Sequence, residues 1–472
     1  MNSGELEEFE DLDENTKKSI IKFNDYLSSL GGGFFDTEEL LEIIDYYFSI
    51  EDNEKLGKAI ELSLSLYPND TEIIVRNAQY IALIKNYVEA IDYLHQYEIL
   101  LPHDTDILFA LGILYSQAGD SEKSIQTLKH CAENEEDLEV FLALGQELMI
   151  NGEHDEAVKI FERTLAIDPT NETALQSLTF CSQFASDTYN HIKFLKQLCL
   201  NNPYSVQNWL TYGLMLYQNE NYFDAITALD LCIAIDEKNF TAHLYKGQSQ
   251  ISLENFQEGI ATLHEAIKLT QDEPIIYFTL GQAYEKQNNW TTAAIYYKEC
   301  IKRDKNNYDA WMGVGMCYFE LNDFASAEPY VKQALELDPS NVHYRLAYAE
   351  MLYKENRIEE GEEMYQTLYD EGFELAIVTV NWALMMAENN RSMDAIHLLQ
   401  ETIEKYNFEE PQIHLALIEL SSREPYLQKY VSEYLFQFLL NNDVTYDMLK
   451  QNCPSILENP EYESLIKTYI NE

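Results

Sequence analysis

Small residues recur along this chain with a fixed period of 34 residues. One row is Gly213, Gly247, Gly281 and Gly315. A second row, twelve residues further on, is Ala225, Gly259, Ala293 and Ala327, and a third is Cys232, Ala266, Cys300 and Ala334. Three rows in one period are hard to produce by chance, so the sequence predicts an internal repeat.

A single unit of this repeat has the pattern of two helices. In the unit from Glu273 to Asn307, apolar and small residues at helical spacing predict a first helix that ends near Lys286. The polar stretch Gln287–Asn289 interrupts the pattern, and a second helix is predicted from Trp290. Helix axes approach closely only where side chains are small, so we expect Gly281 to lie opposite Ala293.

The repeat resembles a known family. Trp311, Gly315, Tyr318, Ala327, Ala334 and Pro339 match the tetratricopeptide pattern, as do Trp209, Gly213 and Ala225, and Ala157, Phe161 and Pro169. The resemblance covers roughly residues 37–443. It implies an all-α, right-handed superhelical solenoid of tandem helix-turn-helix repeats that serves as a binding scaffold, but it does not name a partner.

The register of the repeat divides the chain into three parts. Residues 1–36 are an acidic N-terminal segment with a short helix from Lys17 to Leu30 and a glycine-rich break. Residues 37–443 form the solenoid, and 444–472 are expected to be C-terminal capping helices. Eleven units are predicted to begin near Thr37, Thr71, Thr105, Leu138, Glu172, Val206, Phe240, Pro274, Tyr308, Val342 and Ala376, with a degenerate twelfth near Glu410. Asp36 and Glu39 have the spacing of a capping box.

The unit that begins at Glu172 departs most from the pattern. Thr179 and His191 replace its first two small residues, so we expect its helices to cross less closely. A local bend and a specific role for this unit both remain open.

The charge and the cysteines limit the classes of partner and compartment. A net charge of -51 repels nucleic acid and anionic membranes and attracts basic partners, although it also keeps a long solenoid soluble. Seven cysteines without a Cys-x-x-Cys pair indicate a reducing compartment. We expect a cytoplasmic protein, since neither a signal peptide nor an apolar run of membrane-spanning length is present.

Motifs for chemistry are missing from the sequence. Gly313 and Gly315 lie in a helical pattern without a preceding strand, and His264-Glu265 lacks the second histidine of a zinc helix. We therefore expect no enzyme, no catalytic residue, no cofactor and no metal site.

The resemblance implies a binding groove. In the tetratricopeptide family the second, fifth, ninth, twelfth and thirteenth positions of each unit line the concave face. Here these positions give the candidates Gln79, Phe109, Gln146, Phe184, Tyr217, Gln248, Phe278, Gln282, Met312, Phe319 and Tyr353, together with Gln117, Gln183 and Gln218. Glutamines can hydrogen-bond a peptide backbone, while aromatic and methionine side chains can hold apolar anchors. The alternative is that each residue packs between units.

These observations predict a non-catalytic scaffold that binds a peptide or partner protein in its concave groove. The partner segment is expected to be apolar at its anchors and basic in its flanks. Alanine at Phe278 or Phe319 should then weaken binding. The alternative function is a structural subunit that assembles through its ends or its convex face, and the oligomeric state stays open.

Overall fold

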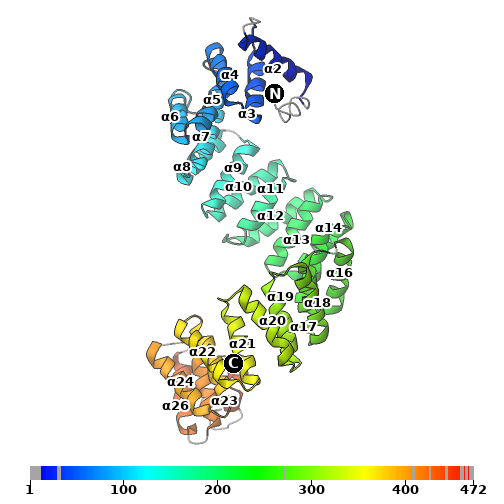
Figure 1. Cartoon of the computed structure of the whole chain (residues 1–472), viewed down its shortest axis with the longest axis vertical. Coiled ribbons are helices and arrows are strands. Elements are labelled where there is room, and N and C mark those ends of the chain that lie inside the picture. Colours follow the sequence, from blue (N-terminus) through cyan, green and yellow to red (C-terminus); the bar gives the residue numbers. More distant parts are fainter. Residues whose placement is uncertain are drawn as a thin grey trace. The chain divides into compact units, whose positions relative to one another are not determined.

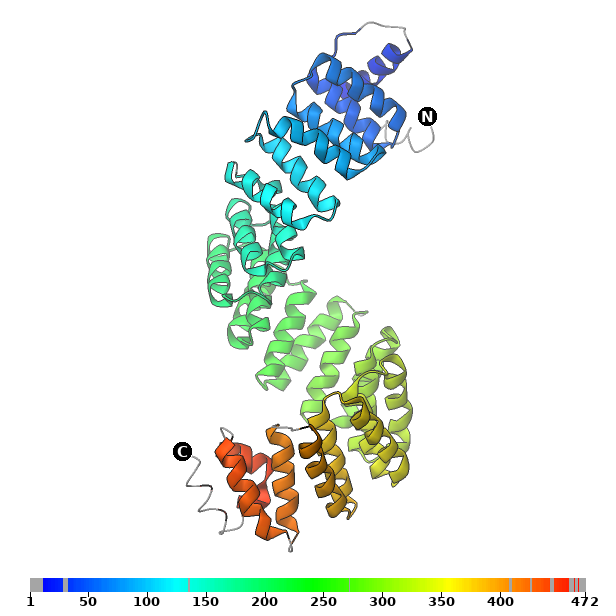
Figure 2. The ribbon, with the colours of Figure 1, turned by 90° about the vertical axis from the view of Figure 1, so that its left-hand side faces the viewer.

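The computed structural model describes residues 12–28, 33–134, 136–270, 272–406, 410–424, 427–441, 445–457, 462 and 466. Within these residues the regular structure is helical throughout and no strand occurs, as the sequence predicts. The helices follow one another as hairpins (Figures 1 and 2). Contacts between Cα atoms divide the chain into two compact units, residues 1–253 and 254–472. Each unit is described by itself.

The first unit contains the helices α2 to α15. Their bounds are α2 Glu14–Leu27, α3 Thr37–Ser49, α4 Asn53–Leu66, α5 Thr71–Ile84, α6 Tyr87–Glu98, α7 Thr105–Gln117, α8 Ser121–Asn134, α9 Leu138–Ile150, α10 His154–Ile167, α11 Glu172–Cys181, α12 Thr188–Asn201, α13 Val206–Gln218, α14 Tyr222–Ile235 and α15 Phe240–Ser252.

The second unit contains the helices α16 to α28. Their bounds are α16 Phe256–Leu269, α17 Pro274–Lys286, α18 Trp290–Arg303, α19 Tyr308–Glu320, α20 Phe324–Leu337, α21 Val342–Lys354, α22 Ile358–Glu371, α23 Leu375–Glu388, α24 Ser392–Tyr406, α25 Pro411–Arg423, α26 Gln428–Asn441, α27 Tyr446–Asn452 and α28 Pro454–Leu457.

Local signals in the sequence mark several helix ends correctly. The predicted break at Gln287–Asn289 is confirmed, because α17 ends at Lys286 and α18 begins at Trp290. The capping box is also confirmed: the Glu39 N–H donates to the Asp36 carboxylate, and the Glu39 carboxylate accepts from the Asp36 N–H. The first helix begins three residues earlier than predicted, at Glu14. Gly31, Gly32 and the acidic residues 1–11 lie outside the described residues.

The turn inside most hairpins uses a left-handed residue. Positive φ angles recur at one position of the repeat, at Glu51, Gly119, Gly152, Glu220, Glu254, Asn288, Asn322, Asn356 and Asn390, although Lys85 at the same position has a φ angle of -121°. This conformation is strained for residues with a Cβ atom, and asparagine and glycine tolerate it best. The turn therefore repeats with the same period as the helices.

The glycines of the first helices accommodate a bulky side chain from the second helices. A Cβ atom on Gly281 would lie 2.5 Å from Cε1 of the Tyr297 ring, so the expectation that Gly281 faces Ala293 is corrected. Ala293 is buried one helical turn earlier. The same relation, a glycine and a large residue sixteen positions later, holds for the pairs Gly112–Leu128, Gly145–Phe161, Gly213–Leu229, Gly281–Tyr297 and Gly315–Val331.

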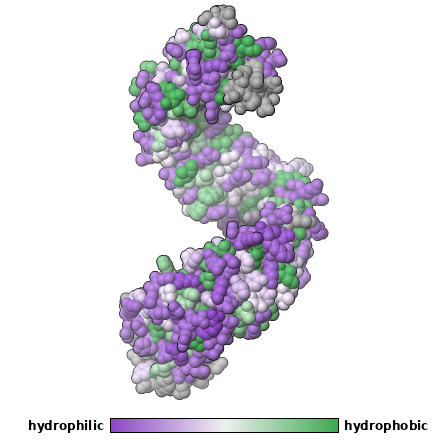
Figure 3. Space-filling view, viewed as in Figure 1, coloured by the Kyte–Doolittle hydropathy of each residue, from purple (hydrophilic) through white to green (hydrophobic). Residues whose placement is uncertain are grey.

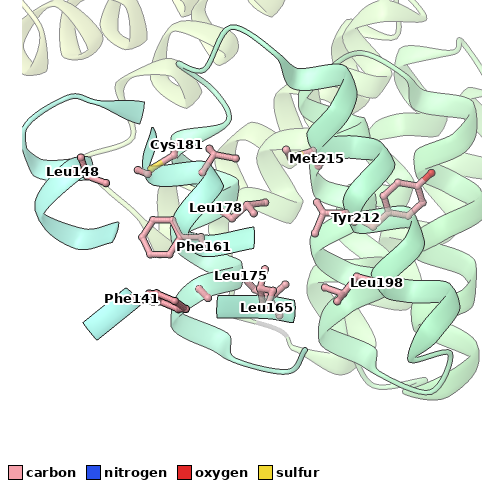
Figure 4. Packing of buried hydrophobic residues seen from close by; sticks show 14 of the residues in the cluster. Phe141, Leu148, Phe161, Leu165, Leu175, Leu178, Cys181, Leu198, Tyr212 and Met215 are labelled. Atoms are coloured by element: carbon pink, nitrogen blue, oxygen red, sulfur yellow. The ribbon is translucent and has the colours of Figure 1, made fainter. Parts of the chain in front are cut away.

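The interiors of both units are built from such contacts. In the first unit Phe161, Leu178 and Cys181 belong to one continuous buried cluster that runs from Leu108 to Ala242 (Figure 4). All seven cysteines are free and buried, including Cys232 and Cys300 of the small-residue row. Burial raises the pKa of the Cys232 thiol to about 11, which disfavours the reactive thiolate.

The irregular unit is packed differently. The backbones of α11 and α12 approach each other less closely than those of the other hairpins in this unit, whereas α11 contacts the first helices α9 and α13 as in a regular repeat. His191 takes the place of a small residue, is buried, and has its Nδ1 2.9 Å from Oε1 of Glu162. The helix α11 has 10 residues, whereas α9 and α13 have 13. Ser186, at the turn position, does not have a positive φ angle.

The C-terminal helices cover the last hairpin. Leu449, Cys453 and Ile456 pack in one cluster with apolar residues of α25 and α26. The buried Glu419 side chain accepts hydrogen bonds from the backbone N–H and the hydroxyl of Ser455, and it pairs with Arg423 at 2.8 Å. A buried carboxylate needs such partners, so this contact ties α28 to α25.

The first prediction concerns the glycine that faces Tyr297. We expect Gly281→Leu to lower the free energy of unfolding by about 1 to 3 kcal/mol, because a side chain there must displace a buried ring. Urea denaturation followed by circular dichroism measures the change. The neighbouring Gln282 is exposed and gives the matched control, Gln282→Leu. Equal stability of Gly281→Leu and the wild type would show that Tyr297 does not need this space.

The second prediction concerns the left-handed turn. Asn288 has a φ angle of 56°. We expect Asn288→Val to cost about 1 to 2 kcal/mol, whereas Asn288→Gly should leave stability within about 1 kcal/mol of the wild type. Thermal unfolding of the two variants tests this, and a valine variant as stable as the glycine variant would contradict it.

Candidate functional site

The first unit contains an open pocket of about 990 Å³. Its lining residues come from α3, α5 and α7, with contributions from the starts of α4, α6 and α9. These first helices of consecutive repeats lie side by side because each hairpin stacks on the next. The pocket is therefore a product of the repeat and not of one hairpin.

Many lining residues of the pocket are apolar, and this apolar set is called the floor below. It contains Phe48, Val75, Leu83, Phe109, Ile113 and Leu114. Most of these side chains are half-buried, and Leu83 is 56% exposed. Their outer faces are thus available to an apolar side chain from another molecule.

Four lining residues of the pocket are acidic. Glu51, Glu72, Asp106 and Glu139 are called its rim below, and Arg76 is the single cationic lining residue among the described residues. The guanidinium of Arg76 is paired with Asp45, with Nε 2.8 Å from Oδ1, and it also donates to Gln79 at 3.3 Å. Because this cation is already neutralised, the rim has a clear excess of negative charge and favours a positively charged ligand.

The candidates in the first unit lie in different surroundings. Gln79, Phe109 and Gln117 line the pocket together. Gln146 is exposed, and the Phe184 side chain is 60% exposed. Tyr217 is half-buried against the rings of Tyr222 and Tyr245, at centroid distances of 5.7 and 5.1 Å, and Gln248 is half-buried. The structure therefore brings three of these candidates into one pocket.

The candidates in the second unit are mostly packed into the repeats. Met312 and Tyr353 are 7% and 4% exposed and belong to buried clusters, because neighbouring helices cover them. Phe278 and Phe319 are half-buried, with ring contacts to Tyr297 and Phe324. Gln282 is exposed. Met312 and Tyr353 are too buried to contact a ligand in this conformation, so they are left out of the proposal below.

The sequence analysis missed the aliphatic floor and the acidic rim. Val75 and Ile113 occupy the fifth and ninth positions of their units, and Glu72, Asp106 and Glu139 occupy the second position. The positional rule includes these residues, but glutamines and aromatic side chains have the more familiar chemistry for peptide binding. The recurrence of an acid at the second position of consecutive units is the signal that could have found the rim.

The second unit has a smaller hollow of about 520 Å³ that involves α21 and α22. Arg345 lies in its lining and forms a two-pronged ion pair with Glu371. Beside it, Glu328 accepts hydrogen bonds from Arg357 at 2.8 Å, from Lys332 at 2.9 Å and from the Tyr348 hydroxyl at 3.0 Å. Hydrogen bonds from Arg357 and Lys332 lower the pKa of Glu328 to about 2. These charged side chains are paired with one another, so they are poorly available for binding a ligand.

The described residues contain no further site of obvious chemistry. No group of three or more histidine, cysteine, aspartate or glutamate side chains among them could hold a metal ion. No helix in the described ranges is both long and apolar enough to cross a membrane. The visible face in Figure 3 is mainly hydrophilic, with hydrophobic residues scattered over it.

Comparison with family models matches much of the chain to one kind of repeat. Residues 105–137, 138–171 and 244–308 match tetratricopeptide repeat models. Residues 277–402 match the middle TPR-like domain of cilia and flagella-associated protein 70, and residues 185–266 match subunit 3 of the anaphase-promoting complex, cyclosome. The chain is a tetratricopeptide repeat protein.

Comparison with solved structures finds other helical repeat proteins. Pseudomonas aeruginosa PilF is 16% identical with a TM-score of 0.37, over 45% of this chain and 97% of PilF. Cut9-Hcn1 from the APC/C is 10% identical with a TM-score of 0.37, over 96% and 98% of the two chains. MamA from Desulfovibrio magneticus is 15% identical with a TM-score of 0.33, over 36% and 97%. A comparison with curated proteins gave no match.

The third prediction concerns the acid stability of this tetratricopeptide repeat protein. Because the pKa of Glu328 is lowered, the stabilisation from its ion pairs is complete above pH 4.5 and is lost as the pH falls towards 2. We expect Glu328→Gln to remove about 1 to 3 kcal/mol of stability at pH 7 and to flatten the loss between pH 4.5 and 2. Urea denaturation at several pH values measures this. The exposed Glu336 on the same helix gives the control, Glu336→Gln, which should keep the wild-type pH profile.

Proposed function

We propose that this chain is a non-catalytic protein-binding scaffold whose first unit holds a segment of a partner protein in the pocket between α3, α5 and α7. The observation that carries the proposal is the combination of apolar lining residues with four acidic lining residues against one arginine, which is itself paired with Asp45. Apolar side chains of the partner would pack on Phe109 and Leu83, and basic flanking residues would face Glu72 and Asp106.

The size of the pocket agrees with this proposal. A volume of about 990 Å³ is at the upper end of the range for small-molecule sites, and the pocket is open along several helices. Its polar lining consists of carboxylates, amide side chains, one tyrosine and the arginine that is already paired with Asp45. Such a site fits several side chains of one peptide better than a single compact substrate.

The chemistry of the lining assigns different parts of the binding energy to different residues. The apolar floor would supply most of the affinity, because burial of apolar surface is the main favourable term in association. The acidic rim would mainly raise the association rate of a basic partner, and this effect falls with salt. Gln79 and Gln117 would hydrogen-bond the partner's backbone.

The fourth prediction tests the floor with peptides selected on the full-length protein from a displayed library of random short peptides. We expect the selected peptides to combine apolar and basic residues, and Phe109→Ala to weaken their binding by more than about 1 kcal/mol. Leu83→Ser should also weaken binding. Leu66 is 46% exposed and lies outside the pocket, so Leu66→Ser is the control and should bind normally.

The rim is tested with the same peptides. Glu72→Gln combined with Asp106→Asn should lower the association rate and its dependence on salt, with a smaller effect on the dissociation rate. Stopped-flow measurements give both rates. If Leu83→Ser and Phe109→Ala bind as the wild type does, the pocket is not the binding surface.

The alternative function is assembly with copies of itself through the ends or the convex face. Size-exclusion chromatography with light scattering distinguishes this function from the scaffold function, because it measures the oligomeric state. A monomer that binds the selected peptides favours the scaffold. Affinity capture from the source cell followed by mass spectrometry would then identify the partner, and the Leu83→Ser variant is the control for capture through the pocket.

A further inference from the structure

A second exposed aromatic surface lies on the irregular repeat of the first unit. Phe180 and Phe184 come from the end of α11 and the residues after it, and His154 is the first residue of α10. The His154 ring stacks on Phe184 with a centroid distance of 4.8 Å, and Phe180 lies 5.4 Å from Phe184 and 6.2 Å from His154. These three residues are called the aromatic site below.

The aromatic site exists because α11 ends early. The chain leaves the helix at Cys181, and a tight turn follows in which the N–H groups of Phe184 and Ala185 both donate to the Cys181 carbonyl at 3.0 Å. Two residues after Phe184, the N–H and hydroxyl of Ser186 donate to Asp155 at 2.8 and 2.9 Å. The position of Phe184 is therefore fixed on both sides before any ligand binds, which lowers the entropy lost on binding.

Both phenylalanine rings remain open to solvent. Phe180 is 48% exposed and Phe184 is 60% exposed, although His154 covers one face of Phe184. Elsewhere in this chain cations cover such faces: the guanidinium of Arg163 lies 4.3 Å from the Phe141 centroid, and that of Arg303 lies 3.9 Å from Tyr277. Over Phe180 and Phe184, no lysine or arginine from the described residues takes this place.

Carboxylates border the aromatic site on the chain segments that build it. Glu153 precedes His154, Asp155 follows it, and Asp187 caps α12 just after the turn. Hydrogen bonds from Ser186 keep the pKa of Asp155 below its usual value, so this group is ionised at neutral pH. The positive charge of Lys159 also lowers the pKa of Asp155, but this one charge does not balance the three carboxylates. The local charge is thus negative around open aromatic faces.

We propose that the aromatic site binds an arginine side chain of the same protein partner, stacked on Phe184 and Phe180 with its charge facing Asp155 and Asp187. A guanidinium is planar, always charged and weakly hydrated, so it suits an open aromatic face bordered by carboxylates. The site adds a specific anchor to the pocket between α3, α5 and α7, and this inference rests on the proposed scaffold function.

The test uses the full-length protein and the peptides selected on it as described above. We expect a subset of these peptides to contain an arginine whose replacement by citrulline, which keeps the shape and removes the charge, weakens binding about five- to tenfold. Phe180→Leu combined with Phe184→Leu keeps the apolar volume and removes the aromatic faces, so it should weaken the arginine peptides to a similar extent. On this variant the citrulline replacement should then have little further effect.

A matched control and a fold check accompany the test. Phe223 is 73% exposed in the same unit and lies outside both surfaces, so Phe223→Leu should bind the arginine peptides as the wild type does. Circular dichroism shows whether the leucine variant folds, and the single variant Phe184→Leu replaces it if the double variant does not.

The outcomes separate this inference from the proposed function. Two results would contradict the inference that the aromatic site binds an arginine. One is wild-type affinity of the arginine peptides for the Phe180→Leu, Phe184→Leu variant, and the other is equal affinity of the citrulline and arginine peptides for the wild type. The scaffold function survives either result as long as Leu83→Ser still weakens binding. If no peptide is enriched on the wild type, both proposals are wrong.

Discussion

The contact between a glycine of the first helix and a bulky residue of the second is the interaction on which the rest of this structure depends. At Gly145, Phe161 fills the space that a side chain would need, and at Gly281 Tyr297 does the same. In these hairpins the two helices approach each other closely because the first helix has no side chain at this point. This approach places the first helices of consecutive repeats side by side, so that their second, fifth and ninth positions form one surface. The pocket in the first unit is lined by three first helices, α3, α5 and α7, of which α7 makes this contact through Gly112.

The acidic rim of that pocket has two physical effects. Glu72, Asp106 and Glu139 each stand in the first turn of a helix, where a negative charge interacts favourably with the exposed N–H groups of the helix end. The same carboxylates border the apolar floor, because every first helix presents its N-terminal turn to the same side of the unit. Helix stability alone would explain an acid at each position. The apolar residues one helical turn further on, Val75 and Phe109, also line the pocket, and they distinguish a binding surface from a set of stabilised helix ends.

The sequence predicts most of the fold but only part of the candidate site. The period, the break at Gln287–Asn289 and the capping box follow from local chemistry, which acts within a few residues and needs no tertiary information. The partner of Gly281 was misassigned because Ala293 and Tyr297 lie one turn apart on the same face, and periodicity cannot tell which of them reaches the glycine. Met312 and Tyr353 are buried for a related reason, since the cover that a neighbouring helix gives depends on packing between repeats.

The irregular repeat shows how a solenoid can give up packing at one place without losing the fold. Each hairpin contacts mainly its neighbours, so the loose crossing of α11 and α12 weakens one interface and leaves the others intact. Two departures occur together there: the left-handed turn residue is absent at Ser186, and α11 stops early at Cys181. A regular repeat would have continued the helix through Phe184 and closed on a small residue in place of His191. Instead, hydrogen bonds from Ser186 to Asp155 hold an exposed turn in place. An irregular repeat that is held in place by its own hydrogen bonds loses some packing between helices. Functional surfaces are expected at such places.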